Sequence, residues 1–148
     1  MQIITLEDVK KASRIAYDAG RLGAQMPNAG PSCSYSSVDA DGNVYHCGIG
    51  AAMSSEVHKG LLHRNKNTNA INILVVSAGT EDLFQLDGPL SDFQEIQSAH
   101  DNWQFLMGRL PDPSCKVAEN KFLKLIEHPS VMPQKIKEPD RVLEVELV

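Results

Sequence analysis

Apolar side chains recur every three to four residues over three segments of this chain, a spacing typical of amphipathic helices. The first segment begins at Thr5, whose hydroxyl is expected to cap a first turn that contains Glu7 and Asp8. We expect this helix to end near Met26, because Pro27 disfavours helical geometry in the residue before it. A neighbouring segment can approach the helix closely on one side, which carries only small residues: Ala12, Ala16, Gly20 and Gly23.

The clearest of the three predicted helices runs from Pro89 to Leu110. Its stripe is expected to face the core and consists of Leu90, Phe93, Ile96, His100, Trp103, Met107 and Leu110. Pro111 and Pro113 end this helix, and Ser114 is expected to cap the third. The third helix should turn five apolar residues inward, namely Val117, Ala118, Phe122, Leu125 and Ile126.

Residues 33–47 predict a β-hairpin. Asp39 at the first position of a type I turn, with Gly42 in a left-handed conformation, favours a three-residue loop over residues 40–42. Ser37 then lies opposite Tyr45. One face of the hairpin carries Cys33, Tyr35, Tyr45 and Cys47, and the other carries Ser34, Ser36, Val44 and His46.

The two cysteines of the hairpin are diagonal neighbours in this register, about 7–8 Å apart, which is too far for an unstrained disulfide. A two-residue turn at Asp41 and Gly42 is the competing register. It would place Cys33 and Cys47 on opposite faces, because a slip of one residue inverts every side chain of a strand.

The remaining segments carry weaker patterns. Residues 48–53 predict a short helix directly after the hairpin. Residues 69–79 have the β-branched composition of a strand, but Asn69 and Gly79 suit the two ends of a helix, and we predict a short helix there. Val142–Val148 alternates apolar and acidic residues, which fits a terminal edge strand or a loose tail. The chain is therefore predicted to be α+β and mostly α, with one hairpin (about residues 33–47) packed on a small helical cluster.

Length and composition predict one domain over residues 1–148, with an extended C-terminal tail over residues 134–148. The net charge of −5 argues against nucleic-acid binding, which needs a basic face to neutralise phosphates. No apolar run is long enough for a membrane span, and the N-terminus lacks the pattern of a signal peptide. Three cysteines suit reduced thiols better than a disulfide framework. These features predict a cytoplasmic protein without membrane contact.

His100 is the residue with the clearest candidate chemistry, because it lies inside the apolar stripe of its helix. We interpret it as a core histidine that joins the hairpin to the helix, since buried histidines are normally hydrogen-bonded. Asp101 adjoins it but points about 100° away around the helix. Asp101 is therefore not expected to orient the His100 ring directly.

A catalytic interpretation of the same region uses Cys47 as a nucleophile. A thiol at the start of a helix is activated by the helix dipole, and an imidazole can act as its base. Cys47, His100 and Gln97 would form such a set. No signature of a known cysteine hydrolase accompanies them, so packing of Cys47 as a small apolar residue is the favoured interpretation.

Zinc binding is a third interpretation, with Cys33, Cys47 and His100 as ligands. The spacing is not that of a zinc finger or ribbon, no Cys-x-x-Cys pair occurs, and His46 points away from the cysteines in the favoured register. The sequence thus predicts no metal and no cofactor.

Several of these residues carry a resemblance to a family of small uncharacterised proteins found in bacteria and their phages. The pattern is Cys-x-Tyr, then Asp-Gly, then Cys-Gly/Ala-Ile-Gly, and later Gln-x-x-His-Asp. The matching residues lie between about 33 and 102: Cys33, Tyr35, Asp41, Gly42, Cys47, Ile49, Gly50, Gln97, His100 and Asp101. The chain departs from the pattern in a longer hairpin and in Met53-Ser-Ser where Ile-Pro-Asp is usual. The resemblance implies a mobile-element origin and helical packing around the hairpin, without assigning an activity.

The favoured functional prediction is a small cytoplasmic accessory or regulatory protein of phage or mobile-element origin. It would bind a host or phage protein, and inhibition of a host defence system fits this profile. One alternative is a thiol-dependent hydrolase or transferase that uses Cys47. The other is a small-molecule-binding protein whose pocket lies between the hairpin and the central helix, lined by Tyr35, Tyr45 and Trp103.

Overall fold

A computed structural model describes residues 1–27, 35–64, 79–107, 109 and 112–127 of the chain. The fold is α+β and mostly α, as predicted, with a β-hairpin packed on helices. The elements follow in the order β1 (Gln2–Thr5), α1 (Leu6–Asp18), η1 (Gly23–Gln25), β2 (Ser36–Val38), β3 (Val44–His46), η2 (Gly50–Ala52), α2 (Ser55–His63), β4 (Phe84–Asp87), α4 (Leu90–Leu106) and α5 (Asp112–Leu125).

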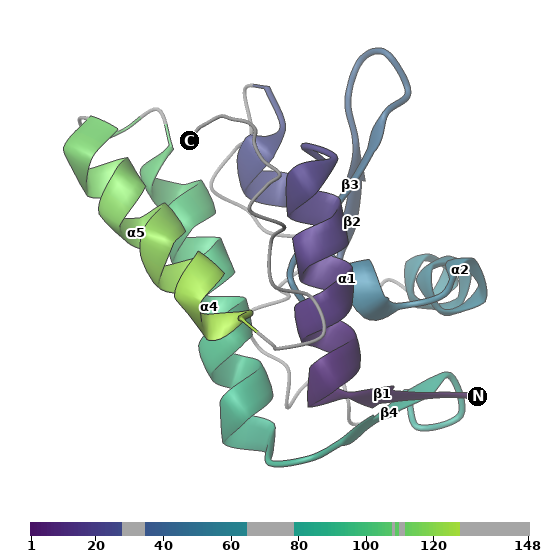
Figure 1. The fold of residues 1–148 in the computed structure, drawn as a ribbon. Helices are drawn as coiled ribbons and strands as arrows, with labels where there is room; N and C mark the ends of the chain where they lie inside the picture. Colours follow the sequence, from purple (N-terminus) through teal and green to yellow (C-terminus); the bar gives the residue numbers. More distant parts are fainter. Residues whose placement is uncertain (28–34, 65–78, 108, 110–111, 128–148) are drawn as a thin grey trace.

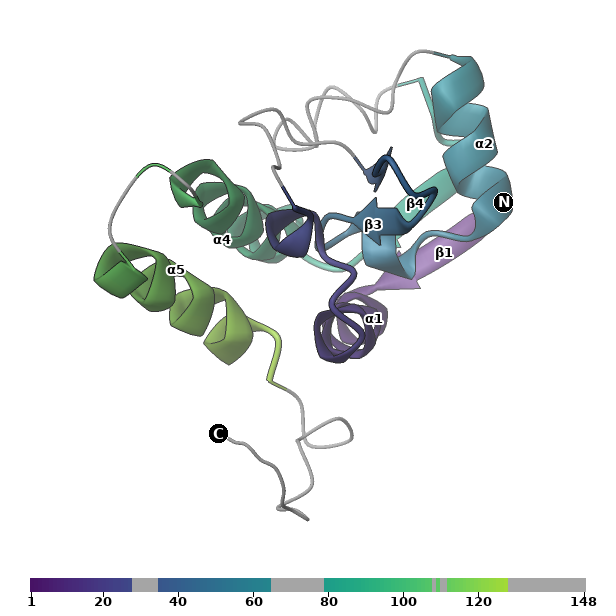
Figure 2. The same ribbon diagram turned by 90° about the horizontal axis from the view of Figure 1, so that it is seen from above.

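Helix α1 and the hairpin occupy the middle of the molecule. Helices α4 and α5 pack together on one side of them, while α2 and the β1–β4 pair lie on the other (Figures 1 and 2). The largest side chains that are fully buried include Tyr35, Phe93 and Phe122, one each from the hairpin base, α4 and α5. The core therefore lies where the hairpin base meets the two C-terminal helices.

The beginning of α1 is as predicted, but its end is not. The Thr5 hydroxyl accepts a hydrogen bond from the Asp8 N–H (3.0 Å), and the Asp8 carboxylate accepts one from the Thr5 N–H (2.9 Å), which forms a capping box. The helix stops at Asp18 and does not continue to Met26. Gly20 has a φ of +72°, and the Arg21 N–H bonds back to the Ala16 carbonyl in a Schellman motif, so glycine ends the helix before Pro27 can.

Helix α4 is shorter than predicted, and α5 begins earlier than predicted. Met107 has already left helical geometry, and it is 38% exposed instead of buried. Helix α5 begins at Asp112, not after Ser114, because proline is tolerated in the first turn of a helix. Val117 was predicted to face inward and is 69% exposed, since the buried face of α5 follows the spacing of Ala118, Phe122 and Ile126.

The three-residue loop of the hairpin is confirmed. Ser37 pairs with Tyr45 and Val38 pairs with Val44, and Gly42 has a φ of +85°. The Asp39 carboxylate accepts hydrogen bonds from the N–H groups of Asp41 and Asn43 (both 2.9 Å), which locks the turn. The competing two-residue turn is therefore wrong.

The short helix predicted after Cys47 is present as the 3₁₀ turn η2, but the parallel pairing of β1 with β4 was not predicted. Gln2 pairs with Phe84 and Thr5 with Asp87, so the N-terminus is joined to the strand that leads into α4. The helix predicted over 69–79 lies outside the described residues, except for its last position, and the predicted tail over 134–148 lies entirely outside them.

Candidate functional site

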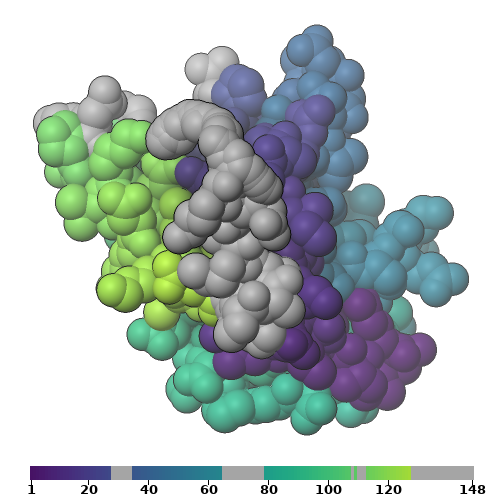
Figure 3. Space-filling view, in the orientation of Figure 1, coloured from purple at the N-terminus to yellow at the C-terminus, as the bar shows by residue number. Residues whose placement is uncertain are grey.

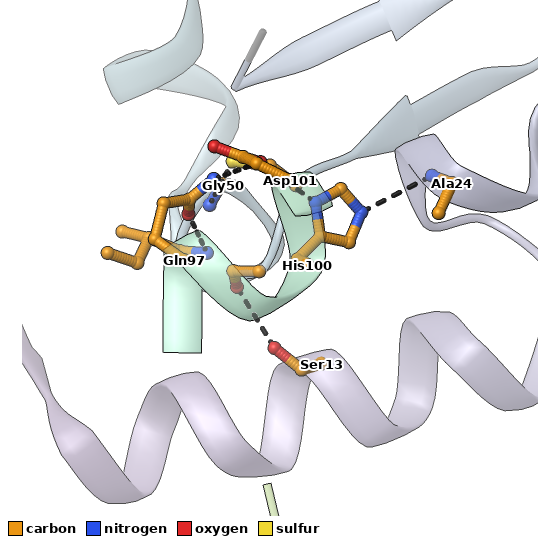
Figure 4. A network of polar contacts seen from close by, with 9 residues as sticks. Ser13, Ala24, Gly50, Gln97, His100 and Asp101 are labelled. Carbon is orange, nitrogen blue, oxygen red and sulfur yellow. Dashed lines mark hydrogen bonds and ion pairs between the residues drawn. The ribbon is translucent and has the colours of Figure 1, made fainter. Parts of the chain in front are cut away.

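A buried polar network on α4 gathers the residues that the sequence marked for chemistry (Figure 4). Gln97 and His100 are fully buried and Asp101 is 4% exposed. The Gln97 amide nitrogen donates to the Asp101 carboxylate (2.9 Å), and His100 Nδ1 lies 3.1 Å from the same oxygen. Asp101 therefore does orient the His100 ring, contrary to the prediction. Helix α4 is covered on more than one side, so the buried face is wide enough to enclose both neighbours.

The hydrogen bonds of His100 assign its tautomer. The Ala24 N–H donates to His100 Nε2 (3.3 Å), so this nitrogen bears the lone pair. Nδ1 then carries the proton and donates it to Asp101. Both ring nitrogens are used within the protein, and the ring packs edge-on against Trp103 and Phe122. His100 is thus a core histidine with satisfied hydrogen bonds.

The network holds the segment that follows the hairpin. The Ile49 N–H donates to the Gln97 side-chain oxygen (3.0 Å), and the Ser13 hydroxyl of α1 donates to the Gly48 carbonyl (3.0 Å). The hairpin is therefore tied to α4 through Gln97, and to α1 through Ser13. This confirms that the hairpin and the His100 helix meet in the interior, although Gln97 makes the direct link.

Cys47 lies at the same junction and is 1% exposed. Its sulfur accepts a hydrogen bond from the Gly50 N–H (3.3 Å). Burial raises the pKa of the Tyr35 hydroxyl well above its usual range, and the neighbouring Cys47 and Asp101 raise it further. Since neither nitrogen of His100 is left to take a proton from a thiol, this geometry suits packing better than nucleophilic catalysis.

The three aromatic residues proposed to line a ligand pocket are all buried. Tyr35 is fully buried, Trp103 is 3% exposed and Tyr45 is 5% exposed. The Tyr45 hydroxyl donates to the Asp39 carboxylate (3.1 Å), and the Trp103 ring packs against Phe122. Within the part of the chain that the structure describes, no group of three or more His, Cys, Asp or Glu side chains is placed to hold a metal. Cys33 of the predicted zinc set lies outside that part.

The outer side of the hairpin carries exposed apolar side chains next to surface hollows. Val38 and Val44 pair across the strands and are 63% and 45% exposed. We call these two valines, with His46 two positions after Val44 in β3, the hairpin face. The hairpin projects from the body of the molecule, at the upper edge in Figures 1 and 3.

Two surface hollows flank β3 and share Val44 and His46. The first, the α1 groove, is mainly apolar and is lined by Ala12, Ile15, Ala16, Ala19, Arg21, Val44, His46 and Ala51. The second, the α2 groove, is more polar and is lined by Ser36, Val44, His46, Met53, Ser55, His58 and Lys59. The small residues of α1 noted in the sequence thus form one wall of an open groove.

His46 and His58 stack in the α2 groove, with ring centroids 4.7 Å apart. His46 Nδ1 lies 3.4 Å from the Tyr35 carbonyl oxygen, and His58 Nε2 lies 2.8 Å from the Gly50 carbonyl oxygen. Burial lowers the pKa of both rings, and His46 lowers that of His58 further. Sequence reasoning missed this pair, because only the packing of α2 against the hairpin brings the two residues together.

The stacked pair predicts a loss of stability in acid. The pKa of each ring in the folded protein lies below its ordinary value of 6.5, so the unfolded chain binds more protons as the pH falls through that value. We expect the urea concentration at the midpoint of unfolding to decrease as the pH is lowered from about 7.5 to about 5.5. His58→Gln should reduce this pH dependence, while His63→Gln, at the end of α2, should leave it unchanged. Equal pH dependence in all three proteins would contradict the assignment.

Comparisons with protein-family models, with curated proteins and with solved structures found no match for this chain. No helix among residues 1–27, 35–64, 79–107 and 112–127 is both long and apolar enough to cross a bilayer. The resemblance to the bacterial and phage family therefore stays a prediction.

Proposed function

We propose that the protein is a small accessory protein that acts by binding another protein through the hairpin face and its flanking grooves. The observation that carries this proposal is the exposed Val38–Val44 pair, which projects from the fold between two hollows. Exposed apolar side chains beside a groove are typical of protein-interaction sites.

The interior network supports the same proposal. The side chains that would serve a thiol enzyme are buried. The polar atoms of Gln97 and His100 are engaged in the hydrogen bonds that hold the hairpin base. Their arrangement suits a rigid support for a projecting surface, since a binding site benefits from preorganisation.

The identity and place of the partner are proposals that rest on the sequence. The resemblance described above favours a host or phage protein as the partner, with inhibition of a host defence system as one role. The odd number of cysteines favours the cytoplasm.

Partner capture with surface variants tests the proposal. Val44→Glu places a charge on the hairpin face, and Val117→Glu makes the same change on α5, at a residue that is 69% exposed. We expect proteins captured from a host lysate by the unmodified chain to be lost with Val44→Glu and retained with Val117→Glu. Both variants should keep a melting temperature close to that of the parent, because exposed substitutions usually change stability by less than about 0.5 kcal/mol. Capture that is insensitive to Val44→Glu would contradict the proposal.

A further inference from the structure

We infer that the partner presents an acidic segment to the hairpin face, in which an apolar side chain is flanked by carboxylates. This inference rests on the proposed function and adds the chemistry of the partner. It is carried by the charges that line the two grooves.

Among the described residues that line them, each groove contains one permanent cation and no carboxylate. Arg21 lines the α1 groove and Lys59 lines the α2 groove. The chain as a whole carries a net charge of −5, so a described lining without carboxylates contrasts with its overall charge. A further hollow near the N-terminus is lined by Glu56 and Asp82, which shows that acidic lining does occur elsewhere.

The partners of Arg21 are neutral. Its guanidinium donates to the Tyr45 hydroxyl (3.3 Å) and to the Asn43 side-chain oxygen (3.2 Å), and it lies 5.3 Å from the centre of the Tyr45 ring. Among the described residues no carboxylate forms an ion pair with Arg21 or Lys59. The Asp39 carboxylate also reaches the Tyr45 hydroxyl, but it is held by the hairpin loop.

Two other arginines of the described residues are paired with carboxylates, whereas Arg109 donates to the Phe105 carbonyl. Arg14 pairs with Asp18 (3.2 Å), and Arg64 forms a two-point contact with Asp82. Arg21 is therefore a positioned guanidinium that forms no ion pair with a described carboxylate, and guanidinium recognises carboxylates by paired hydrogen bonds. Val44 is 45% exposed and lines both the groove of Arg21 and that of Lys59, so it favours an apolar group at the centre of the occupant.

Fluorescence anisotropy with two labelled peptides tests this inference on the whole 148-residue chain. In the first peptide glutamate alternates with valine and leucine, and in the second glutamine replaces every glutamate. We expect the glutamate peptide to bind about fivefold more tightly at low salt, because exposed charge pairs contribute about 0.2–1 kcal/mol each. The difference should shrink between about 0.1 M and 1 M salt, where screening is strong.

Charge-reversal variants locate the effect. Lys59→Glu should weaken binding of the glutamate peptide about fivefold or more. Lys121→Glu makes the same change in net charge at an exposed position of α5, and it should leave the affinity unchanged. Equal losses in the two variants would overturn the inference, since net charge alone would then explain them.

Three further outcomes would overturn the inference. In the first, both peptides bind the parent chain with equal affinity, and the glutamine peptide no longer binds the Val44→Glu variant. This result would support the docking surface but not its preference for acidic partners. Failure of both peptides to bind would reject this occupant, while the lysate experiment tests the surface independently. In the third, the glutamate peptide binds only to the variant that carries both Glu144→Gln and Glu146→Gln. That result would show that the acidic C-terminal sequence of this chain competes for the surface, and it would assign the surface to that sequence.

Discussion

Gly50→Ala is expected to destabilise the protein by about 3 kcal/mol or more, which corresponds to a fall of about 10 °C in melting temperature. A Cβ atom at this position would overlap the carbonyl oxygen of Tyr35 and approach its carbonyl carbon within 2.9 Å. The obstacle is backbone, so no side-chain rotation can relieve it. The hairpin base and η2 would have to separate, although Tyr35 is fully buried and Gly50 is buried.

Gly48→Ala is the matched control, two residues earlier in the same turn. A Cβ there would meet Ile96 at 3.5 Å and Phe122 at 3.6 Å, which are ordinary van der Waals distances. We expect this variant to change stability by less than about 1 kcal/mol. Thermal unfolding of the two proteins measures the difference. Similar melting temperatures would show that Tyr35 does not lie against Gly50 as described.

His100→Ala is expected to cost about 3–5 kcal/mol of unfolding free energy. The substitution leaves a cavity beside Trp103 and Phe122. It also leaves the Ala24 N–H without its acceptor and removes a donor from the buried Asp101 carboxylate. Urea denaturation followed by tryptophan fluorescence is a direct measurement, because Trp103 is the only tryptophan in the chain.

His100→Phe separates the hydrogen bonds from the packing. Phenylalanine keeps a ring between Trp103 and Phe122 but cannot bond to Ala24 or Asp101. We expect it to remain destabilised by about 2 kcal/mol, less than the alanine variant. A phenylalanine variant as stable as the parent would mean that the network contributes packing alone, and the structural role assigned to its hydrogen bonds would be wrong.

These two predictions also bear on the proposed function. Gly50 and His100 lie at the base from which the hairpin projects, and neither is exposed. Variants that loosen this base should weaken partner binding without touching the hairpin face. Val44→Glu should do the reverse, weakening binding while leaving the melting temperature unchanged.

Local chemistry was sufficient to predict several elements from the amino-acid order. The Thr5–Asp8 capping box and the Asp39–Gly42 loop depend on hydrogen bonds between residues at most four positions apart. The same kind of signal is present at Gly20, whose Schellman motif ends α1 well before Pro27. The burial of His100 followed from helical periodicity.

Contacts between distant segments could not be predicted in this way. The pairing of Gln2 with Phe84 joins strands too short to show a pattern of their own. Asp101 reaches His100 because α4 is covered on more than one side, which the periodicity of a single helix does not reveal. The His46–His58 stack and the two grooves exist only after α1 and α2 pack beside β3. Short-range hydrogen bonds thus specify the turns and caps, whereas the surface offered to a partner depends on how the finished elements pack.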